Sequence, residues 1–196
     1  MRIIKAPHSY QEEIRKSRFL AQAVFLASAE QAPELIAQLS THNVSHNCWA
    51  WRCGDQYRFT DDGEPGGTAG RPILAAIENQ QFDQVLIVVT RWYGGIQLGT
   101  GGLARAYGGC ANQVLQTAMS EELVPRTLLT GHCPYTYLDV FKVRIAEAGA
   151  VINSEEFDAE GAVLNVAVPD NQVTALQNML SEATRGASSL QEVQLP

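Results

Sequence analysis

The sequence of 196 residues contains few cysteines, and the four that occur, Cys48, Cys53, Cys110 and Cys133, form no C-x-x-C pair. This spacing argues against a zinc ribbon and a dense disulfide framework, so we expect reduced thiols in a cytoplasmic protein. No apolar run approaches the roughly 18 residues of a membrane span, and no signal-peptide pattern opens the chain. We therefore expect no membrane partner.

The sequence also lacks the common catalytic motifs. It has no Gly-Lys-Ser/Thr, no G-x-S-x-G and no H-E-x-x-H, which argues against P-loop NTPases, α/β hydrolases and zinc proteases of the usual kind. His42, His46 and Cys48 have a spacing that metal ligands can have, but no second ligand pair lies near them. We predict no metal, no cofactor and no catalytic residue, and we expect His46 to be a structural or surface histidine.

The net charge of −7 is unevenly distributed along the chain. Residues 1–118 carry ten Lys/Arg and ten Asp/Glu, whereas residues 119–196 carry four Lys/Arg and eleven Asp/Glu. The overall charge therefore argues against non-specific binding of nucleic acid by the whole chain. Binding of RNA would need a local basic face in the first part.

The first part of the chain shows alternating strand and helix patterns. Ser28 is a candidate cap for the first helix, and Thr68 is a candidate cap for the second. The apolar run Val85–Val89 is typical of a strand buried on both faces. The expected elements are strands over 17–27, 47–53, 57–60 and 84–92, and helices over 28–41, 72–81 and 102–120.

A second domain follows a linker over 121–126, where the charge changes and Pro125 occurs. The pattern from 127 onward reads β-α-β-β-α-β, which is the ferredoxin-like order. The sequence thus predicts an α+β protein with domains over 1–121 and 127–196.

Two glycine-rich segments stand out, Gly63–Gly70 and Gly94–Gly102, each directly before a predicted helix. Ordering glycine costs backbone entropy, so this density needs a physical reason. The second segment could present the backbone N–H groups of Gly99, Thr100, Gly101 and Gly102 to an anion, with Arg91 and Arg105 adding charge. Alternatively, both segments only allow helix and sheet to pack closely.

Acidic residues Asp61, Asp62 and Glu64 stand at the start of the first glycine segment. They could hold Mg²⁺ or act as acid and base. We favour a structural role, in which they cap backbone N–H groups of a turn or form salt bridges with Arg58 and Arg71.

Aromatic side chains alternate with arginines around the predicted hairpin. Trp49, Trp51 and Tyr57 could stack on RNA bases while Arg58 and Arg71 contact phosphate. The alternative is an ordinary half-buried sheet face, which we favour for the two tryptophans.

The segments HNCWAWRCG, FTDDGEPGGTAGRPIL and VVTRWYGGIQLGTGGLARAY together resemble the core signature of the IMPACT family, and of its bacterial, YigZ-like members in particular. The resemblance implies that the first domain has the α+β fold of a small-subunit ribosomal protein and of domain IV of elongation factor G. It also implies a ferredoxin-like second domain. Eukaryotic members of the family regulate translation, but this chain lacks their N-terminal interaction domain.

The leading interpretation is a non-enzymatic cytoplasmic binding protein linked to translation. Its first domain would contact RNA or the ribosome, and its acidic second domain would contact a protein partner. Two alternatives remain open. One is an enzyme that acts on a phosphorylated small molecule at the glycine segments, and the other is a protein–protein regulator that does not bind nucleic acid.

Overall fold

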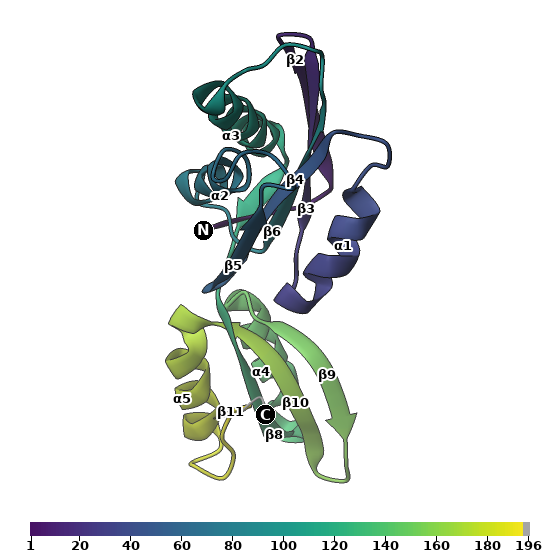
Figure 1. The fold of residues 1–196 in the computed structure, drawn as a ribbon. Coiled ribbons are helices and arrows are strands. Elements are labelled where there is room, and N and C mark those ends of the chain that lie inside the picture. Colours follow the sequence, from purple (N-terminus) through teal and green to yellow (C-terminus); the bar gives the residue numbers. More distant parts are fainter. Residues whose placement is uncertain (194–196) are drawn as a thin grey trace. The chain divides into compact units, whose positions relative to one another are not determined.

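The computed structural model of the chain describes residues 1–193 (Figure 1). The chain forms two compact units, with the boundary between Leu123 and Val124. Both units combine helices and strands, as expected for the α+β class. Within the described residues, no helix is both long and apolar enough to cross a membrane.

A five-stranded antiparallel sheet is the centre of the first domain, with the strand order β2-β3-β6-β4-β5. The central strand β6 is buried from Val85 to Arg91, because helices cover both of its faces. This confirms the prediction from its apolar run. The strands are β2 (His8–Ile14), β3 (Ser17–Phe25), β4 (His46–Cys53), β5 (Gln56–Thr60) and β6 (Val85–Trp92).

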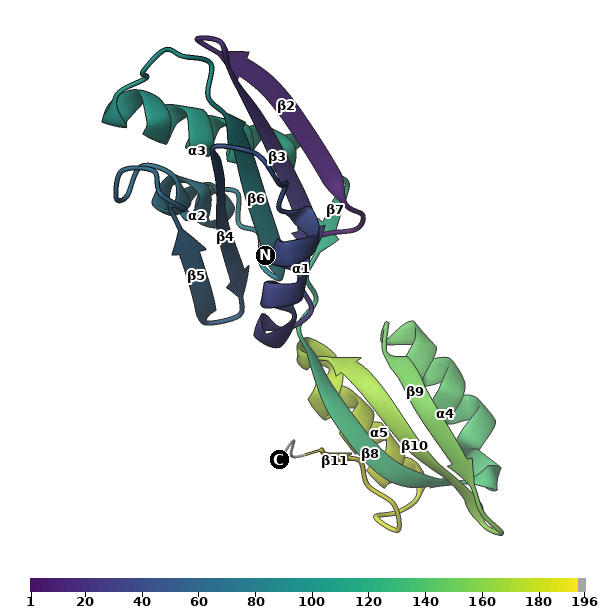
Figure 2. The ribbon, with the colours of Figure 1, turned by 45° about the vertical axis from the view of Figure 1, so that its right-hand side comes forward.

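Helices cover the two faces of this sheet unequally (Figures 1 and 2). Helices α2 (Gly70–Asn79) and α3 (Thr100–Thr117) lie on one face, which holds the larger apolar core. Helix α1 (Ala32–Leu39) lies on the other face over a smaller core. Ser28 makes no side-chain capping bond, and a short 3₁₀ turn precedes α1; the predicted helix start there is wrong by about one turn.

The segment that we expected to begin a linker contributes a strand instead. β7 (Ser120–Glu122) pairs antiparallel with β1 (Arg2–Ile4) near the start of the chain. Glu121 and Glu122 therefore belong to the first domain, and the domain boundary follows them.

The second domain has the element order that the sequence predicts, β-α-β-β-α-β. Its sheet has the order β11-β8-β10-β9, with antiparallel neighbours. Its core lies between this sheet and the two helices. The elements are β8 (Arg126–Pro134), α4 (Tyr135–Glu147), β9 (Val151–Phe157), β10 (Gly161–Pro169), α5 (Val173–Ala183) and β11 (Gln191–Glu192).

Candidate functional site

Asp61 follows β5 and organises the first glycine segment. Its carboxylate accepts hydrogen bonds from the backbone N–H groups of Gly67, Ala69 and Gly70 at 2.8–2.9 Å. Burial acts to raise the pKa of Asp61, but these three donors lower it below its ordinary value. Helix α2 therefore begins on a carboxylate that lies well before it in the chain. The predicted cap, Thr68, instead donates its hydroxyl to a backbone carbonyl.

The same segment is bound to strand β4 by three further contacts. The carboxylate of Asp62 accepts the N–H of Asn47 at 2.6 Å, and its backbone carbonyl accepts from Nδ1 of His46 at 2.7 Å. The thiol of Cys48 donates to the carbonyl of Asp61 at 3.0 Å. Burial, above all, raises the pKa of the Cys48 thiol to about 12. Asp61 and Asp62 thus anchor the backbone, as we expected for a structural role.

Glu64, the third acidic residue, is buried in the first domain together with Arg91. Oε1 of Glu64 lies 2.6 Å from Nη1 of Arg91 and accepts the hydroxyl of Tyr107 at 2.7 Å. Burial is also the main reason that the pKa of Tyr107 lies far above its ordinary value. Arg91 also reaches the hydroxyl of Ser17 at 3.4 Å. The pair of Glu64 and Arg91 joins the first glycine segment to the centre of the sheet.

The expectation that Arg91 is exposed to phosphate is therefore wrong. Along β6, Arg91 shares the face of Val85, Ile87 and Val89, because side chains alternate along a strand. That face packs against α2 and α3, so the guanidinium is 5% exposed and needs a buried counter-charge. Glu64 supplies that charge.

A cavity of about 560 Å³ opens between the two glycine segments. The first segment contributes Glu64, and the second contributes Leu98, Gly99 and Thr100. Tyr93 also lines the cavity and is 49% exposed. The structure therefore brings together two segments that the sequence shows only as separate motifs.

The N-terminus of helix α3 lies in the wall of this cavity. Gly99 takes the left-handed conformation with φ +73°, and the first turn of the helix contains no acidic residue. The first N–H group with an intrahelical bond is that of Leu103, which donates to Gly99 at 2.9 Å. Within residues 1–193, the N–H groups of Thr100, Gly101 and Gly102 have no hydrogen-bond partner. Free N–H groups at the positive end of a helix dipole suit an anion.

His46 also lines the cavity, although we expected a structural or surface histidine. A carbonyl oxygen can only accept a hydrogen bond, so Nδ1 of His46 donates to Asp62. Nε2 lies 3.8 Å from Oε1 of Glu64. The sequence could have indicated this position of His46. Side chains alternate along a strand, so His46 shares the face of Cys48 and Ala50, which pack against α2 and α3.

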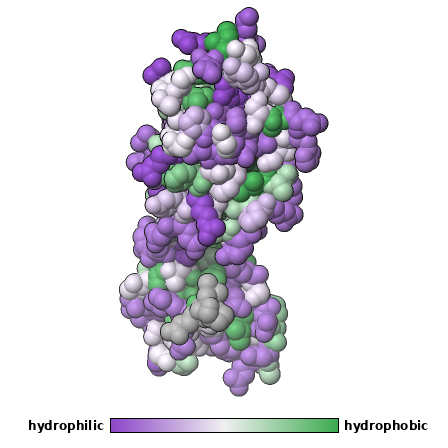
Figure 3. All heavy atoms as spheres, viewed as in Figure 1, coloured by the Kyte–Doolittle hydropathy of each residue, from purple (hydrophilic) through white to green (hydrophobic). Residues whose placement is uncertain are grey.

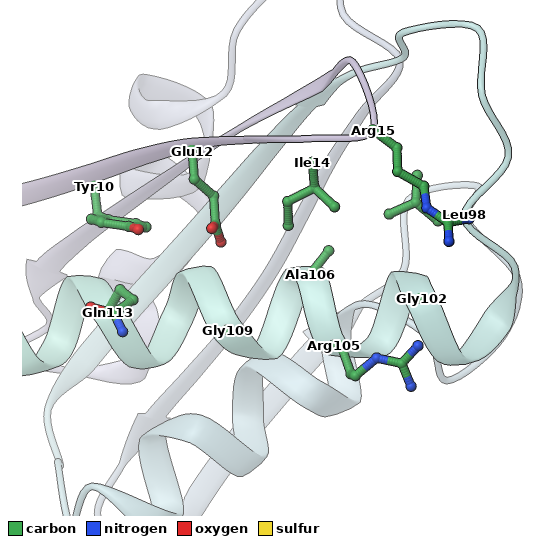
Figure 4. Close-up of a pocket in the computed structure, with 10 residues that line it drawn as sticks. All are labelled: Tyr10, Glu12, Ile14, Arg15, Leu98, Gly102, Arg105, Ala106, Gly109 and Gln113. Carbon is green, nitrogen blue, oxygen red and sulfur yellow. The ribbon is translucent and has the colours of Figure 1, made fainter.

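Four exposed cations lie at the same end of the sheet: Arg15 and Lys16 in the β2–β3 turn, Arg105 on α3, and Arg18 on the opposite face of the sheet beside Trp92. Arg15 and Arg105 lie at the same end of a groove between β2 and α3, together with Leu98 (Figure 4). None of the four forms an ion pair with another residue in the described part of the chain. We call these four side chains the cationic end. Only Arg105 was among the sequence candidates.

The other candidates do not form one surface. Trp49 and Trp51 face α1, where Trp51 is buried and Trp49 is partly buried. Tyr57 pairs with Arg52 in the hairpin, and its side chain lies on the opposite face. Arg58 shares a groove with the two tryptophans, whereas Arg71 is exposed at the start of α2. The predicted stacking set is therefore divided by the sheet.

The acidic residues do not assemble a metal site. Over residues 1–193, no three His, Cys, Asp or Glu side chains are grouped so that they could hold a metal ion. Neither Arg58 nor Arg71 forms the predicted salt bridge with Asp61, Asp62 or Glu64 in this part of the chain.

Comparisons with known proteins agree with the two-domain organisation. The family of the Impact N-terminal domain matches residues 15–115, and a family described as a domain of unknown function (DUF1949) matches residues 132–187. A solved structure described as the crystal structure of a hypothetical protein covers 100% of this chain and 98% of its own, with 34% identity and a TM-score of 0.72.

Several relatives extend over nearly the whole chain. The IMPACT family member YigZ of Escherichia coli is 35% identical over 94% of this chain and 94% of its own. A family member of Thermus thermophilus is 38% identical over 88% of this chain and 96% of its own. Protein IMPACT of Mus musculus matches 43% of this chain and 29% of its own length, at 36% identity. The chain belongs to the IMPACT family.

Proposed function

We propose that the first domain binds RNA, free or within the ribosome, through the cationic end. The observation that carries this proposal is the set of four exposed cations that form no ion pair within residues 1–193, Arg15, Lys16, Arg18 and Arg105. The first domain as a whole is close to neutral. A local concentration of unpaired positive charge is therefore the feature that a phosphate backbone would recognise.

The hairpin turn between β2 and β3 supports this proposal. Arg15 and Lys16 both have left-handed backbone conformations, with φ 46° and 65°. Two-residue hairpin turns of this kind favour Asn-Gly, and an L-residue with a side chain costs roughly 1 kcal/mol at such a position. This turn thus carries two cations at a cost in stability, which favours a role in contacting a charged partner.

One aromatic side chain, that of Trp92, stands beside a cation of this group. The guanidinium of Arg18 lies 3.7 Å from the centre of the Trp92 ring, and the next residue, Tyr93, is 49% exposed. Stacking on bases would therefore fall to Trp92 and Tyr93 rather than to the hairpin aromatics. Arg91 has no part in this contact because Glu64 neutralises it.

The family membership extends the proposal to translation. We infer that the first domain shares the fold of a ribosomal protein and of domain IV of elongation factor G, and that the second domain is ferredoxin-like. The acidic second domain would repel phosphate, so we assign it to a protein partner. A cytoplasmic location and a non-enzymatic role complete the proposal.

The test is RNA binding measured by fluorescence anisotropy across a salt series. The variant Arg15→Asn/Lys16→Gly removes two cations and installs the preferred turn, so its stability should be equal or higher. We expect its affinity to fall at least about tenfold at low salt, and the slope of log K against log salt to become shallower by about two.

The matched control is Arg185→Asn in the second domain. Arg185 is also exposed and also has a left-handed conformation, with φ 54°, so this control repeats the Arg→Asn half of the change at a site away from the cationic end. Its RNA affinity should equal that of the wild type. Equal affinities for the turn variant and the control, or no binding of RNA or ribosomes at low salt, would refute the proposal.

A protein–protein regulator would need a continuous exposed apolar surface of several hundred Å². On the face shown in Figure 3, hydrophobic residues of the first domain form small separate groups among hydrophilic ones. This face of the first domain therefore does not supply such a surface.

A further inference from the structure

We propose that the cavity between the two glycine segments binds a small zwitterion, a free α-amino acid, with its ammonium group at Glu64 and its carboxylate at the N-terminus of α3. This site shares Tyr93 with the proposed RNA contact, but it is argued from other contacts and does not depend on that proposal.

The first support is the free oxygen of Glu64. Arg91 and Tyr107 both approach Oε1, at 2.6 and 2.7 Å. Within the described residues, no hydrogen bond reaches Oε2, although the side chain is only 3% exposed and lines the cavity. Because Oε2 has no donor from residues 1–193 and Glu64 lines the cavity, a ligand with a positively charged donor could bind this oxygen.

His46 provides a second acceptor next to Glu64. Its Nδ1 is occupied by the carbonyl of Asp62, so the neutral ring leaves the lone pair of Nε2 on the side of Glu64. Two neighbouring acceptors fit an ammonium group, which has several donors.

The N-terminus of α3, in contrast to Glu64 and His46, offers hydrogen-bond donors that lack an acceptor within the described part of the chain. The N–H groups of Thr100, Gly101 and Gly102 have no partner among residues 1–193, and the helix has no acidic residue in its first turn. By contrast, α2 receives the carboxylate of Asp61 at its own N-terminus. A ligand carboxylate at α3 would complete the same arrangement from outside the chain.

The charge of the cavity selects a zwitterion over a phosphate ester. Glu64 and Arg91 neutralise each other, and the helix end contributes about half a positive charge. A dianionic phosphate would bring excess negative charge beside Glu64, whereas a zwitterion keeps the cavity close to neutral. Pro65, Leu98 and Leu103 provide apolar walls for a side chain.

The experiment is isothermal titration calorimetry of the full chain with each of the twenty standard amino acids. At least one should bind, and its N-acetyl and its carboxamide derivatives should each bind about ten- to a hundredfold more weakly, because each has lost one charged contact. Inorganic phosphate should not compete at the same concentration.

The variant Thr100→Asp separates binding from folding. An aspartate in the first turn stabilises the helix, so the thermal midpoint should not fall, but it occupies the carboxylate site and should abolish binding. Thr100→Ser is the matched control and should bind as the wild type does.

Three results would overturn the proposal: no binding of any amino acid at millimolar concentration, equal binding of the blocked derivatives, or unchanged binding by Thr100→Asp. The turn variant Arg15→Asn/Lys16→Gly should bind the amino acid normally. Failure of the RNA proposal is therefore distinguishable from failure of this one.

Discussion

Replacing Glu64 with Gln tests whether the buried pair with Arg91 holds the two glycine segments together. The substitution keeps the shape of the side chain and keeps an oxygen that can accept from Tyr107. It removes the counter-charge of a guanidinium that is 5% exposed. Nε of Arg91 already lacks a hydrogen-bond partner within the described residues, so the arginine has little other compensation.

The expected magnitude follows from the cost of leaving a buried charge unpaired. Glu64→Gln and Arg91→Met should each lower the free energy of unfolding by about 3–5 kcal/mol. The double variant removes both charges at similar volume, so it should be no less stable than the worse single variant. The sum of the two single costs should therefore exceed the double cost by at least about 3 kcal/mol.

Tryptophan fluorescence in urea is the appropriate assay. All three tryptophans, at positions 49, 51 and 92, lie in the first domain, so the signal reports that domain alone. The control is Glu121→Gln, because the pair of Lys5 and Glu121 is about half exposed on both sides; this change should cost no more than about 1 kcal/mol. Additive costs in the cycle would show that Glu64 and Arg91 do not act as a pair.

Three further predictions test the loops and the thiols. Folding lowers the pKa of Asp61 below 3.8. Its contribution to the free energy of unfolding is therefore complete above that pH and is lost as the pH falls through the folded-state pKa. In Asp61→Asn, the free energy of unfolding should fall less steeply with pH below about pH 4. Gly94→Ala would place Cβ against the backbone oxygen of Lys16 in the β2–β3 turn, so it should lower the free energy of unfolding in urea by about 1–3 kcal/mol. The control Gly66→Ala would place Cβ in open space and should change that free energy by no more than about 0.5 kcal/mol. Cys48, buried with its pKa raised to about 12, should react with a thiol reagent only on unfolding, and mass spectrometry should find half-buried Cys53 labelled first.

Local patterns in the sequence were sufficient for most of the elements. The alternation along β3 and the apolar run of β6 each reflect burial within a few residues, and both strands occur where predicted. The register of the β4–β5 hairpin could also be predicted from the sequence. A turn at Gly54–Asp55 sets Tyr57 opposite Arg52, which places Tyr57 on the face away from Trp51.

The errors arise where a partner is distant in the chain. Thr68 satisfies the local rule for a helix cap, but Asp61 reaches α2 because the loop folds back on itself. β7 pairs with a strand almost 120 residues earlier. The burial of Arg91 depends on Glu64, 27 residues away. Composition and periodicity contain no information about such contacts between residues that are distant in the chain.

The glycine segments then have two physical roles rather than one. Close packing explains Gly70 and Gly94, because a Cβ at either position would overlap the backbone of a neighbouring segment. Gly99 and Gly101 have no such overlap with backbone, and they lie where α3 presents its free N–H groups. Packing alone therefore does not account for the second segment, and a ligand of the kind proposed above would have to tolerate Glu64. A phosphate backbone would meet that condition only outside the cavity, at the cationic end, where no carboxylate of residues 1–193 pairs with the four cations.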